Sequence, residues 1–181
     1  MAGIAAGRVV IVTGAGNGLG RAYALGLAAE GARVVVNDLG VGIHGEDSVS
    51  RGAAERVVDE IRAAGGEAVA NSDDVADWDA GRRIVQTALD HFGTLHAVVN
   101  NAGFVRDRMF VSATPDEWDA VTRVHLRGHF CTSRHAVDYW RAQQKAATRS
   151  TPVSSTLPPA PACKAASANP PIQPPRRASP H

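Results

Sequence analysis

The sequence predicts an α/β fold built on a doubly wound sheet of parallel strands. Short apolar runs rich in β-branched residues alternate with segments of helical periodicity, and the connections between them are short. The first two runs, RVVIVTG and ARVVVND, are apolar at almost every position, which is typical of strands that helices cover on both faces. Strand–helix alternation of this kind produces parallel strands joined by right-handed crossovers.

Four strands and four helices are expected along the chain. The strands are predicted at 8–14, 32–38, 66–72 and 95–103. The helices are predicted at 18–30, 48–64, 77–92 and 115–145, the last with a break near Gly128. Residues 7–145 then form one domain, the N-terminal part of a doubly wound sheet with the strands in the spatial order 3-2-1-4.

Composition and charge narrow the class of protein. The 181 residues suffice for one domain with a core, and the net charge of +1 gives no bias toward nucleic acid or an anionic membrane. Two cysteines do not make a disulfide framework, and neither a signal peptide nor an apolar run of membrane-spanning length is visible. We therefore expect a soluble cytoplasmic protein that acts on small molecules.

The composition changes sharply after residue 145. Nine of the ten prolines lie at 152 or beyond, and the last glycine is Gly128. No aromatic residue occurs after this change, so the segment buries too little apolar surface to offset the entropy lost on ordering. We predict that residues 146–181 form a disordered tail rich in Pro, Ala and Ser.

The best signal of a binding site is the motif TGAGNGLG, between the first strand and the first helix. Gly14 can make the tight turn, Gly18 lets the backbone approach a pyrophosphate, and Gly20 lets the helix pack on the sheet. Asn17 and Leu19 lie between them, where the helix N-terminus offers free N–H groups to phosphates. The pattern predicts a Rossmann-type nucleotide site, and a purely structural glycine turn is the alternative.

Asp38 follows the second strand, 20 positions after Gly18. A carboxylate at this place accepts hydrogen bonds from the ribose hydroxyls of the adenosine and would repel a 2′-phosphate. It therefore favours NAD over NADP as the cofactor. The alternative is an aspartate that starts a turn before Leu39 and Gly40.

Three motifs together resemble the short-chain dehydrogenase/reductase family: TGxxxGxG, DDV at 73–75 and NNAG at 100–103. The stretches GLGRAYALG, GARVVVNDLG, NNAGFVRDRMF and RVHLRGHF resemble most the branch with the (3R)-hydroxyacyl-CoA dehydrogenase domain of multifunctional enzymes. The resemblance implies that Asp74 and Val75 border the adenine. It also implies that Asn100, Ala102 and Gly103 line the nucleotide and steady the central strand. In intact relatives it implies a small-molecule substrate, such as an acyl-CoA, and a homo-oligomer.

The catalytic group of that family is absent from this sequence. The resemblance implies a tyrosine acid/base followed four residues later by a lysine that lowers its pKa, together with a serine and an asparagine. Neither Tyr23 nor Tyr139 has such a lysine, so no Tyr-x-x-x-Lys occurs. His125 stands where the family usually has the asparagine, either as a packing histidine or in a proton relay. No glutamate follows it as a helical zinc motif requires, so we expect no metal site.

We hypothesise that a change of reading frame near residues 146–149 produced the atypical C-terminal segment. The family-type sequence PVDARVINTSSGAGLQGSVG, written in G/C-rich codons and read one base late, can give RSTPVSSTPPPAPACKAASA. Residues 149–168 differ from this output only at Leu157. We therefore expect a chain descended from an NAD-dependent dehydrogenase of secondary alcohols that is itself inactive. The alternatives are a nucleotide-binding remnant and a product without any activity.

Overall fold

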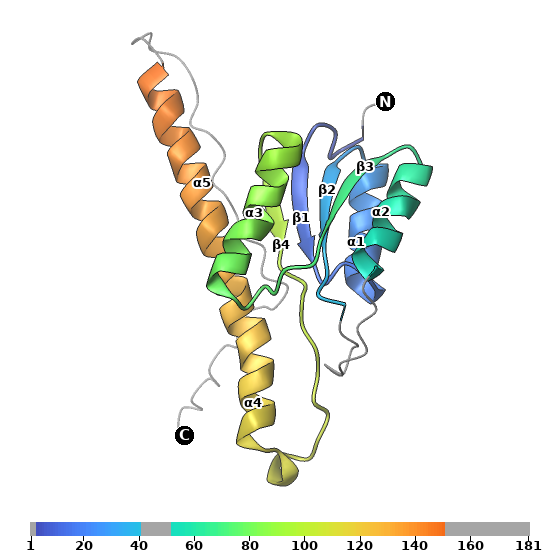
Figure 1. Cartoon of the computed structure of the whole chain (residues 1–181), viewed down its shortest axis with the longest axis vertical. Helices are drawn as coiled ribbons and strands as arrows, with labels where there is room; N and C mark the ends of the chain where they lie inside the picture. The colour runs from blue at the N-terminus through green and yellow to red at the C-terminus, as the bar shows by residue number, and fades with distance from the viewer. Residues whose placement is uncertain (1–2, 41–51, 151–181) are drawn as a thin grey trace, which may run out of the picture.

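The structure is a computed structural model that describes residues 3–40 and 52–150, with side chains up to Ala147 (Figure 1). Its strands are β1 (Val9–Thr13), β2 (Arg33–Asn37), β3 (Glu67–Asn71) and β4 (Ala97–Val99). Its helices are α1 (Gly18–Ala29), α2 (Ala53–Ala63), α3 (Trp78–Phe92), α4 (Pro115–Thr122) and α5 (His129–Ser150). A short 3-10 turn, η1 (Phe110–Ser112), precedes α4, and a π-helical turn, η2 (Arg123–Gly128), joins α4 to α5.

All four strands are parallel and lie in the order β3-β2-β1-β4, which confirms the predicted fold class and strand order. In the register of the central strands, Ile11 of β1 pairs with Val35 of β2 and with Val98 of β4. Because both neighbours of β1 come from crossovers, its carboxyl end lies at the point where the strand order reverses. Ligands of doubly wound sheets bind at this point.

Alternate residues of β1 supply two separate cores. Val10 and Val12 face α1 and α2, where they pack against Val57 and Ile61. Ile11 faces the opposite side, where α3 contributes Ile84. The period of two along a strand thus places one helical layer on each face of the sheet, as Figure 1 shows.

The helix ends follow local capping chemistry. Asp77 caps α3 by accepting a hydrogen bond from the Ala80 N–H at 2.7 Å, and Gly93 ends this helix in the left-handed conformation. Thr114 and Glu117 form a reciprocal capping box at the start of α4, with Pro115 in its first turn. The backbone hydrogen bond from Thr114 lowers the pKa of the Glu117 carboxyl.

The fourth strand is shorter than the predicted 95–103 and covers only Ala97–Val99. It pairs with β1 alone, and all three of its residues are half-buried, whereas every residue of β1 is buried. β4 is therefore the edge of the sheet in the described part of the chain. Its chain leaves the ladder at Asn100, where side chains rather than a further strand hold it in place.

The predicted helix 115–145 forms, but its interruption differs from the expected break. Six residues, Arg123–Gly128, make a π-helical turn that continues directly into α5. α5 runs on to Ser150, five residues past the predicted end of the helix at 145. Residues 151–181 lie outside the described part, so the prediction of disorder there is untested. Among the described helices, none combines the length and hydropathy of a membrane span.

Candidate nucleotide-binding site

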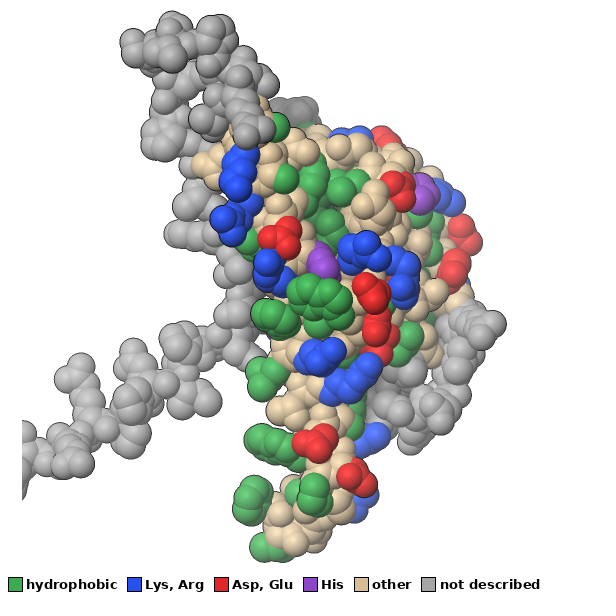
Figure 2. Space-filling model, turned by 60° about the vertical axis from the view of Figure 1, so that its left-hand side comes forward, with side chains coloured by type: hydrophobic (Ala, Val, Ile, Leu, Met, Phe, Trp, Pro, Cys, Tyr) green, Lys and Arg blue, Asp and Glu red, His purple; other side chains and the backbone are tan. Residues whose placement is uncertain are grey.

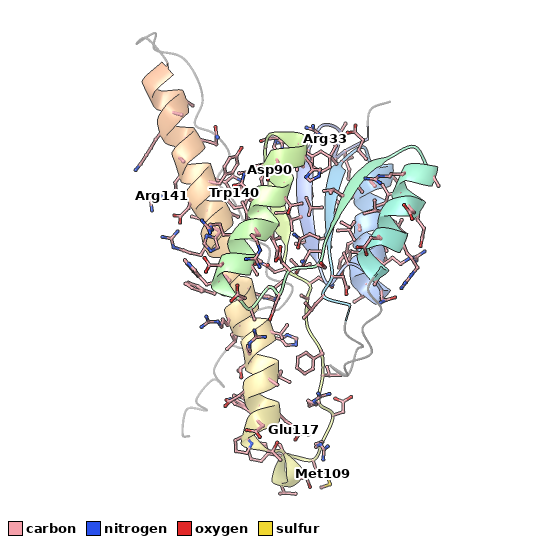
Figure 3. All side chains as sticks on the ribbon, viewed as in Figure 1. Arg33, Asp90, Met109, Glu117, Trp140 and Arg141 are labelled. Atoms are coloured by element: carbon pink, nitrogen blue, oxygen red, sulfur yellow. The ribbon has the colours of Figure 1, made fainter. Side chains whose placement is uncertain are left out.

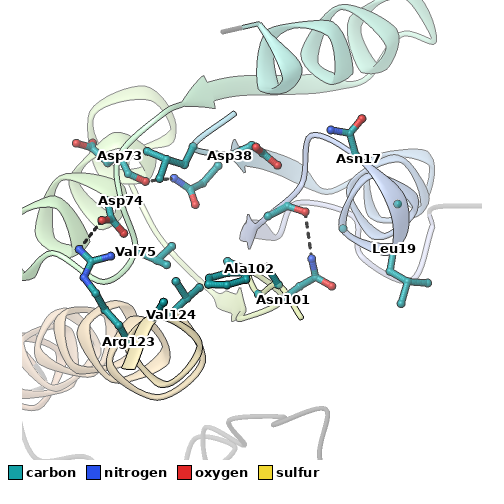
Figure 4. Close-up of a pocket in the computed structure, with 18 of the residues that line it drawn as sticks. Asn17, Leu19, Asp38, Asp73, Asp74, Val75, Asn101, Ala102, Arg123 and Val124 are labelled. Carbon is teal, nitrogen blue, oxygen red and sulfur yellow. Dashed lines mark hydrogen bonds and ion pairs between the residues drawn. The ribbon is translucent and has the colours of Figure 1, made fainter. Parts of the chain in front are cut away.

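A cavity of about 560 Å³ opens at the carboxyl ends of β1, β2 and β3 (Figure 4). Ten of the eleven residues predicted to bind the cofactor line this cavity. They are Gly14, Asn17, Gly18, Leu19, Gly20, Asp38, Asp74, Val75, Ala102 and Gly103. The structure therefore brings together segments from four separate parts of the chain, one after each strand. The exception is Asn100, whose side chain faces α5 instead.

The glycines of the first turn are required by backbone geometry and by close contacts. Gly14 has a φ of 62°, and a Cβ there would lie 2.8 Å from the Ala102 Cα. A Cβ on Gly20 would lie 2.0 Å from the Gly14 carbonyl oxygen, so only glycine lets α1 approach the turn. Gly18 has a φ of 53° and would meet no atom within 4 Å, so its backbone faces open space. This space is where a ligand can approach.

The N-terminus of α1 borders the cavity without a side-chain cap. Asn17 occupies the capping position, but its side chain accepts no hydrogen bond from the helix. The first N–H groups of a helix have no intrahelical partner and carry partial positive charge. Beside them, the Leu19 side chain is exposed. This end of α1 therefore offers hydrogen-bond donors and an apolar surface to a ligand in the cavity.

The carboxylate of Asp38 is held at the end of β2 by two backbone groups. Its Oδ2 accepts a hydrogen bond from the Gly16 N–H at 2.7 Å, and its Oδ1 accepts one from the Gly40 N–H at 2.8 Å. A Cβ on Gly16 would lie 2.8 Å from the Asp38 Cγ, so this glycine is needed for the contact. Sequence reasoning missed Gly16, although it lies inside the quoted TGAGNGLG motif.

Two other carboxylates follow β3, and an arginine neutralises each of them. Asp73 pairs with Arg83 of α3 at 2.6 Å, and Asp74 pairs with Arg123 of η2 at 2.6 Å. None of the ion pairs found among the described residues includes Asp38. Figure 4 shows these three aspartates along one side of the cavity and Leu19 on the other. Among the residues that the structure describes, Asp38 is therefore the cavity aspartate without an ion-pair partner.

The NNAG segment closes the cavity beside β1, but the side chain that steadies the strand is Asn101. Its amide donates to the carbonyls of Thr13 and Gly14 at 3.0 and 3.1 Å. The Thr13 hydroxyl in turn accepts from the backbone N–H groups of Asn101 and Ala102 at 3.0 Å each. Asn100, which was expected to steady the strand together with Ala102 and Gly103, bonds Thr132 and Ser133 of α5 at 2.6 and 2.9 Å. The repeated asparagine in NNAG was the signal for Asn101.

His125 lies against the same segment. Its Nε2 is 2.9 Å from the carbonyl oxygen and 3.2 Å from the backbone nitrogen of Phe104. A Cβ on Gly103 would lie 2.4 Å from the His125 Cε1, so glycine makes room for the ring. One turn further along, burial lowers the pKa of the His129 imidazole. In this geometry His125 holds the backbone that borders the cavity.

Both tyrosines lie in the described part of the chain, and neither lines the cavity. Tyr139 donates to the Thr94 hydroxyl at 3.3 Å, near the start of β4 and so at the opposite end of the strand from the cavity. Tyr23 is exposed on α1. Within residues 3–40 and 52–150, no three His, Cys, Asp or Glu side chains are grouped to hold a metal ion.

The comparisons with known proteins agree with this geometry. The family model for short chain dehydrogenases matches residues 8–155. The chain belongs to the short-chain dehydrogenase family. This result confirms the resemblance seen in the sequence, and the family uses a nicotinamide nucleotide together with a substrate.

Similar short-chain dehydrogenases include both curated proteins and a solved structure. The chain is 55% identical over 137 residues to peroxisomal multifunctional enzyme type 2 of Mus musculus, covering 76% of this chain and 18% of that protein. It is 47% identical over 143 residues to hydroxyacyl-CoA dehydrogenase ChsB1 of Mycobacterium tuberculosis, covering 77% and 42%. The crystal structure of a short chain dehydrogenase from Mycobacterium avium superposes with a TM-score of 0.72 at 60% identity, covering 80% of this chain and 49% of that one. The chain thus spans half or less of the length of these relatives.

Proposed function

We propose that this chain binds the adenosine and pyrophosphate part of NAD and does not itself catalyse hydride transfer. The observation that carries the first half is the Asp38 carboxylate, held by Gly16 and Gly40 beside the uncapped end of α1. An anion-accepting helix end next to a ribose-accepting carboxylate suits a dinucleotide. The glycine turn supports the same proposal, because side chains at Gly14 and Gly20 would clash with neighbouring backbone.

The proposal favours NAD over NADP. A 2′-phosphate on the adenosine ribose would lie close to Asp38, whose negative charge no arginine or lysine balances in the described ion pairs. Like charges brought together in a partly buried site repel each other. We therefore expect at least about tenfold weaker binding of NADP than of NAD, a difference of roughly 1.4 kcal/mol.

Calorimetric titration tests the binding proposal. We expect the purified chain to bind ADP-ribose and NAD with similar affinity, because the residues that line the cavity serve the adenosine and pyrophosphate. Asp38→Asn keeps the size of the side chain and removes the charge, so it should reduce the preference for NAD over NADP. If neither ADP-ribose nor NAD produces heat at millimolar concentration, the binding proposal is wrong.

The proposed lack of catalysis has its own support and its own test. The printed sequence contains no Tyr-x-x-x-Lys, and the two tyrosines lie away from the cavity. We expect no oxidation of NADH by a 3-ketoacyl-CoA above the rate of a blank. Turnover at an ordinary enzymatic rate, about 1 per second or more, would contradict the proposal. Sequencing the gene through codons 140–180 tests the frame change, because a single-base shift should restore Tyr-x-x-x-Lys downstream.

For a complete protein that contains this segment, we propose NAD-dependent oxidation of a 3-hydroxyacyl-CoA or a similar secondary alcohol. The similarity to the hydroxyacyl-CoA dehydrogenase of Mycobacterium tuberculosis supports this substrate class. We also propose a homo-oligomer for that protein and a cytoplasmic location for the chain, the latter from its low cysteine content. The name of the mouse relative specifies the peroxisome, so a fluorescent fusion would distinguish the two compartments.

A further inference from the structure

We propose that Arg123 and Arg127 of η2 are positioning residues that hold the wall of the nucleotide cavity formed by residues 74–76. The inference rests on the proposed binding of an adenine nucleotide at this site. The two arginines belong neither to the glycine turn nor to the end of β2, where Asp38 lies, on which the proposed function rests. Its basis is a set of contacts between a single helical turn and two loops that are distant in sequence.

The first contacts join η2 to the loop after β3. The Arg123 guanidinium donates from Nη2 to the Asp74 Oδ2 at 2.6 Å, and the Arg127 Nε donates to the Ala76 carbonyl at 2.8 Å. A Cβ on Gly128 would lie 2.8 Å from the Val75 Cγ2, so the helix backbone packs closely on this loop. Each residue from 74 to 76 thus contacts η2.

The second set of contacts joins the same turn to the loop after β4. His125 lies against Gly103 and bonds the main chain of Phe104. Asp74 and Val75 line the cavity on one side, and Gly103 and Phe104 line it on another. Arg123 and Val124 line it as well, as Figure 4 shows. η2 therefore spans two walls of the cavity and forms part of it.

Burial explains why the Arg127 contact matters. Ala76 is 1% exposed, so water does not reach its carbonyl freely. A buried carbonyl without a hydrogen-bond partner is unfavourable in the folded state. Without Arg127, the loop backbone would move so that the Ala76 carbonyl could bond to water. Val75 would move with it. The arginine thereby fixes the position of residues that contact the ligand.

Charge explains why the Arg123 contact matters. Asp73, Asp74 and Asp38 all lie on the cavity, and a dinucleotide brings two further negative phosphates. Arg123 neutralises Asp74 at the cavity edge, with its own side chain 49% exposed. Removing it would leave a second uncompensated carboxylate facing the ligand. Loss of Arg123 should therefore weaken binding by electrostatic repulsion as well as by loosening the loop.

The test uses matched arginine substitutions in the full chain. Arg127→Ala and Arg123→Ala remove the two contacts, and Arg127→Lys and Arg123→Lys restore a donor and a positive charge. Arg134→Ala is the control, because Arg134 pairs with Asp138 on the exposed face of α5. Amide hydrogen exchange of the free protein and calorimetric titration with ADP-ribose are measured for every variant.

We expect Arg127→Ala to raise the exchange rate of peptides covering 73–78 while β1 and β2 stay protected. The dissociation constant for ADP-ribose should rise about tenfold in each alanine variant and recover in part in each lysine variant. Arg134→Ala should match the unsubstituted chain in both measurements. If an alanine variant does not fold, as its thermal melt will show, the lysine variant and its exchange pattern serve as the comparison.

The outcomes separate this inference from the proposed function. If the unsubstituted chain does not bind ADP-ribose, the proposed function fails, while the exchange of 73–78 still decides whether the arginines hold the loop. If the chain binds and the alanine variants at 123 and 127 match Arg134→Ala in exchange and affinity, the inference is wrong. Faster amide exchange of 73–78 with an unchanged dissociation constant for ADP-ribose also overturns the inference. The arginines would then stabilise the loop without affecting the ligand.

Discussion

The sheet with its helices and the segment from residue 105 to 137 differ in how completely their apolar side chains are covered. Around the sheet, helices α1 and α2 cover one face and α3 covers most of the other, and the residues of β1 and most of those of β2 are buried. From residue 105 to 137, large apolar side chains lie on the surface instead. They are Val105, Met109, Phe110, Val111, Trp118, Leu126, Phe130 and Val137. Figure 2 shows such side chains gathered on the lower arm that contains α4.

The contrast shows that the burial of an element depends on how many other elements pack around it. β1 lies between two strands and two helical layers, so its residues are fully enclosed. α4 and η1 project from the sheet, with Met109 and Glu117 near the far end of this arm (Figure 3), and Phe110 is 91% exposed. α5 does contact the body, since Trp140 donates from its indole N–H to the Leu95 carbonyl at 2.8 Å. Large apolar side chains that gather on an exposed surface are typical of a contact face.

The largest expected effect is a difference in the free energy of unfolding between alanine substitutions at a core position, Ile11, and at an exposed position of similar size, Leu126. Ile11→Ala empties space in the middle of β1, where the side chain is 0% exposed, and should lower the free energy of unfolding by about 2–5 kcal/mol. Leu126→Ala removes a side chain that is 68% exposed and should change it by less than about 0.5 kcal/mol. Urea denaturation measures both. Equal losses would show that the two regions are equally packed.

The second effect compares two glycines of the same helix. Gly20→Ala brings a Cβ against the Gly14 carbonyl and should lower the free energy of unfolding by about 1–3 kcal/mol, with weaker binding of ADP-ribose. Gly26→Ala meets no atom within 4 Å and should raise it by about 0.5–1 kcal/mol, because alanine favours the helix. Thermal denaturation and calorimetry would measure the pair. A stabilising Gly20→Ala would contradict the close approach of α1 to the turn.

The smallest effect concerns the pH dependence of stability at the start of β4. The His96 Nδ1 accepts a hydrogen bond from the Val9 N–H at 2.9 Å, and burial, aided by Arg8 and Arg33, lowers the His96 pKa below its usual 6.5. The unfolded chain then binds a proton more readily than the folded one, so stability should fall as the pH drops below about 6.5 toward the lowered pKa.

His96→Asn tests this prediction, because its side-chain oxygen can still accept from the Val9 N–H and does not titrate. Urea denaturation at pH 7.5 and 5.5 should show a smaller loss of stability in this variant than in the unsubstituted chain. His91→Asn, on the exposed surface of α3, is the matched control and should keep the original loss. An unchanged pH dependence in His96→Asn would assign the effect to other groups, such as His129, whose pKa burial also lowers.

Much of the fold and part of the site could be predicted from local patterns. The apolar runs located both ends of β1, β2 and β3 to within one residue, because continuous apolar runs leave little polar signal to misread. β4 was predicted too long, since its apolar run continues into a segment that side chains, not a ladder, hold in place. Asn101 was missing from the residues expected to steady the central strand, because sequence alone does not show which of two adjacent amides points toward β1.

The sequence by itself determined the parallel α/β order, the glycine turn and the single aspartate after β2. These features follow from periodicity, from the steric freedom of glycine and from spacing along one chain, and all of these are local properties. Only the tertiary structure decided that Arg83 and Arg123 neutralise Asp73 and Asp74, and that η2 joins the two loops beside the cavity. Such contacts depend on the distance between atoms that lie 10 to 51 positions apart in the chain, which only the folded packing sets.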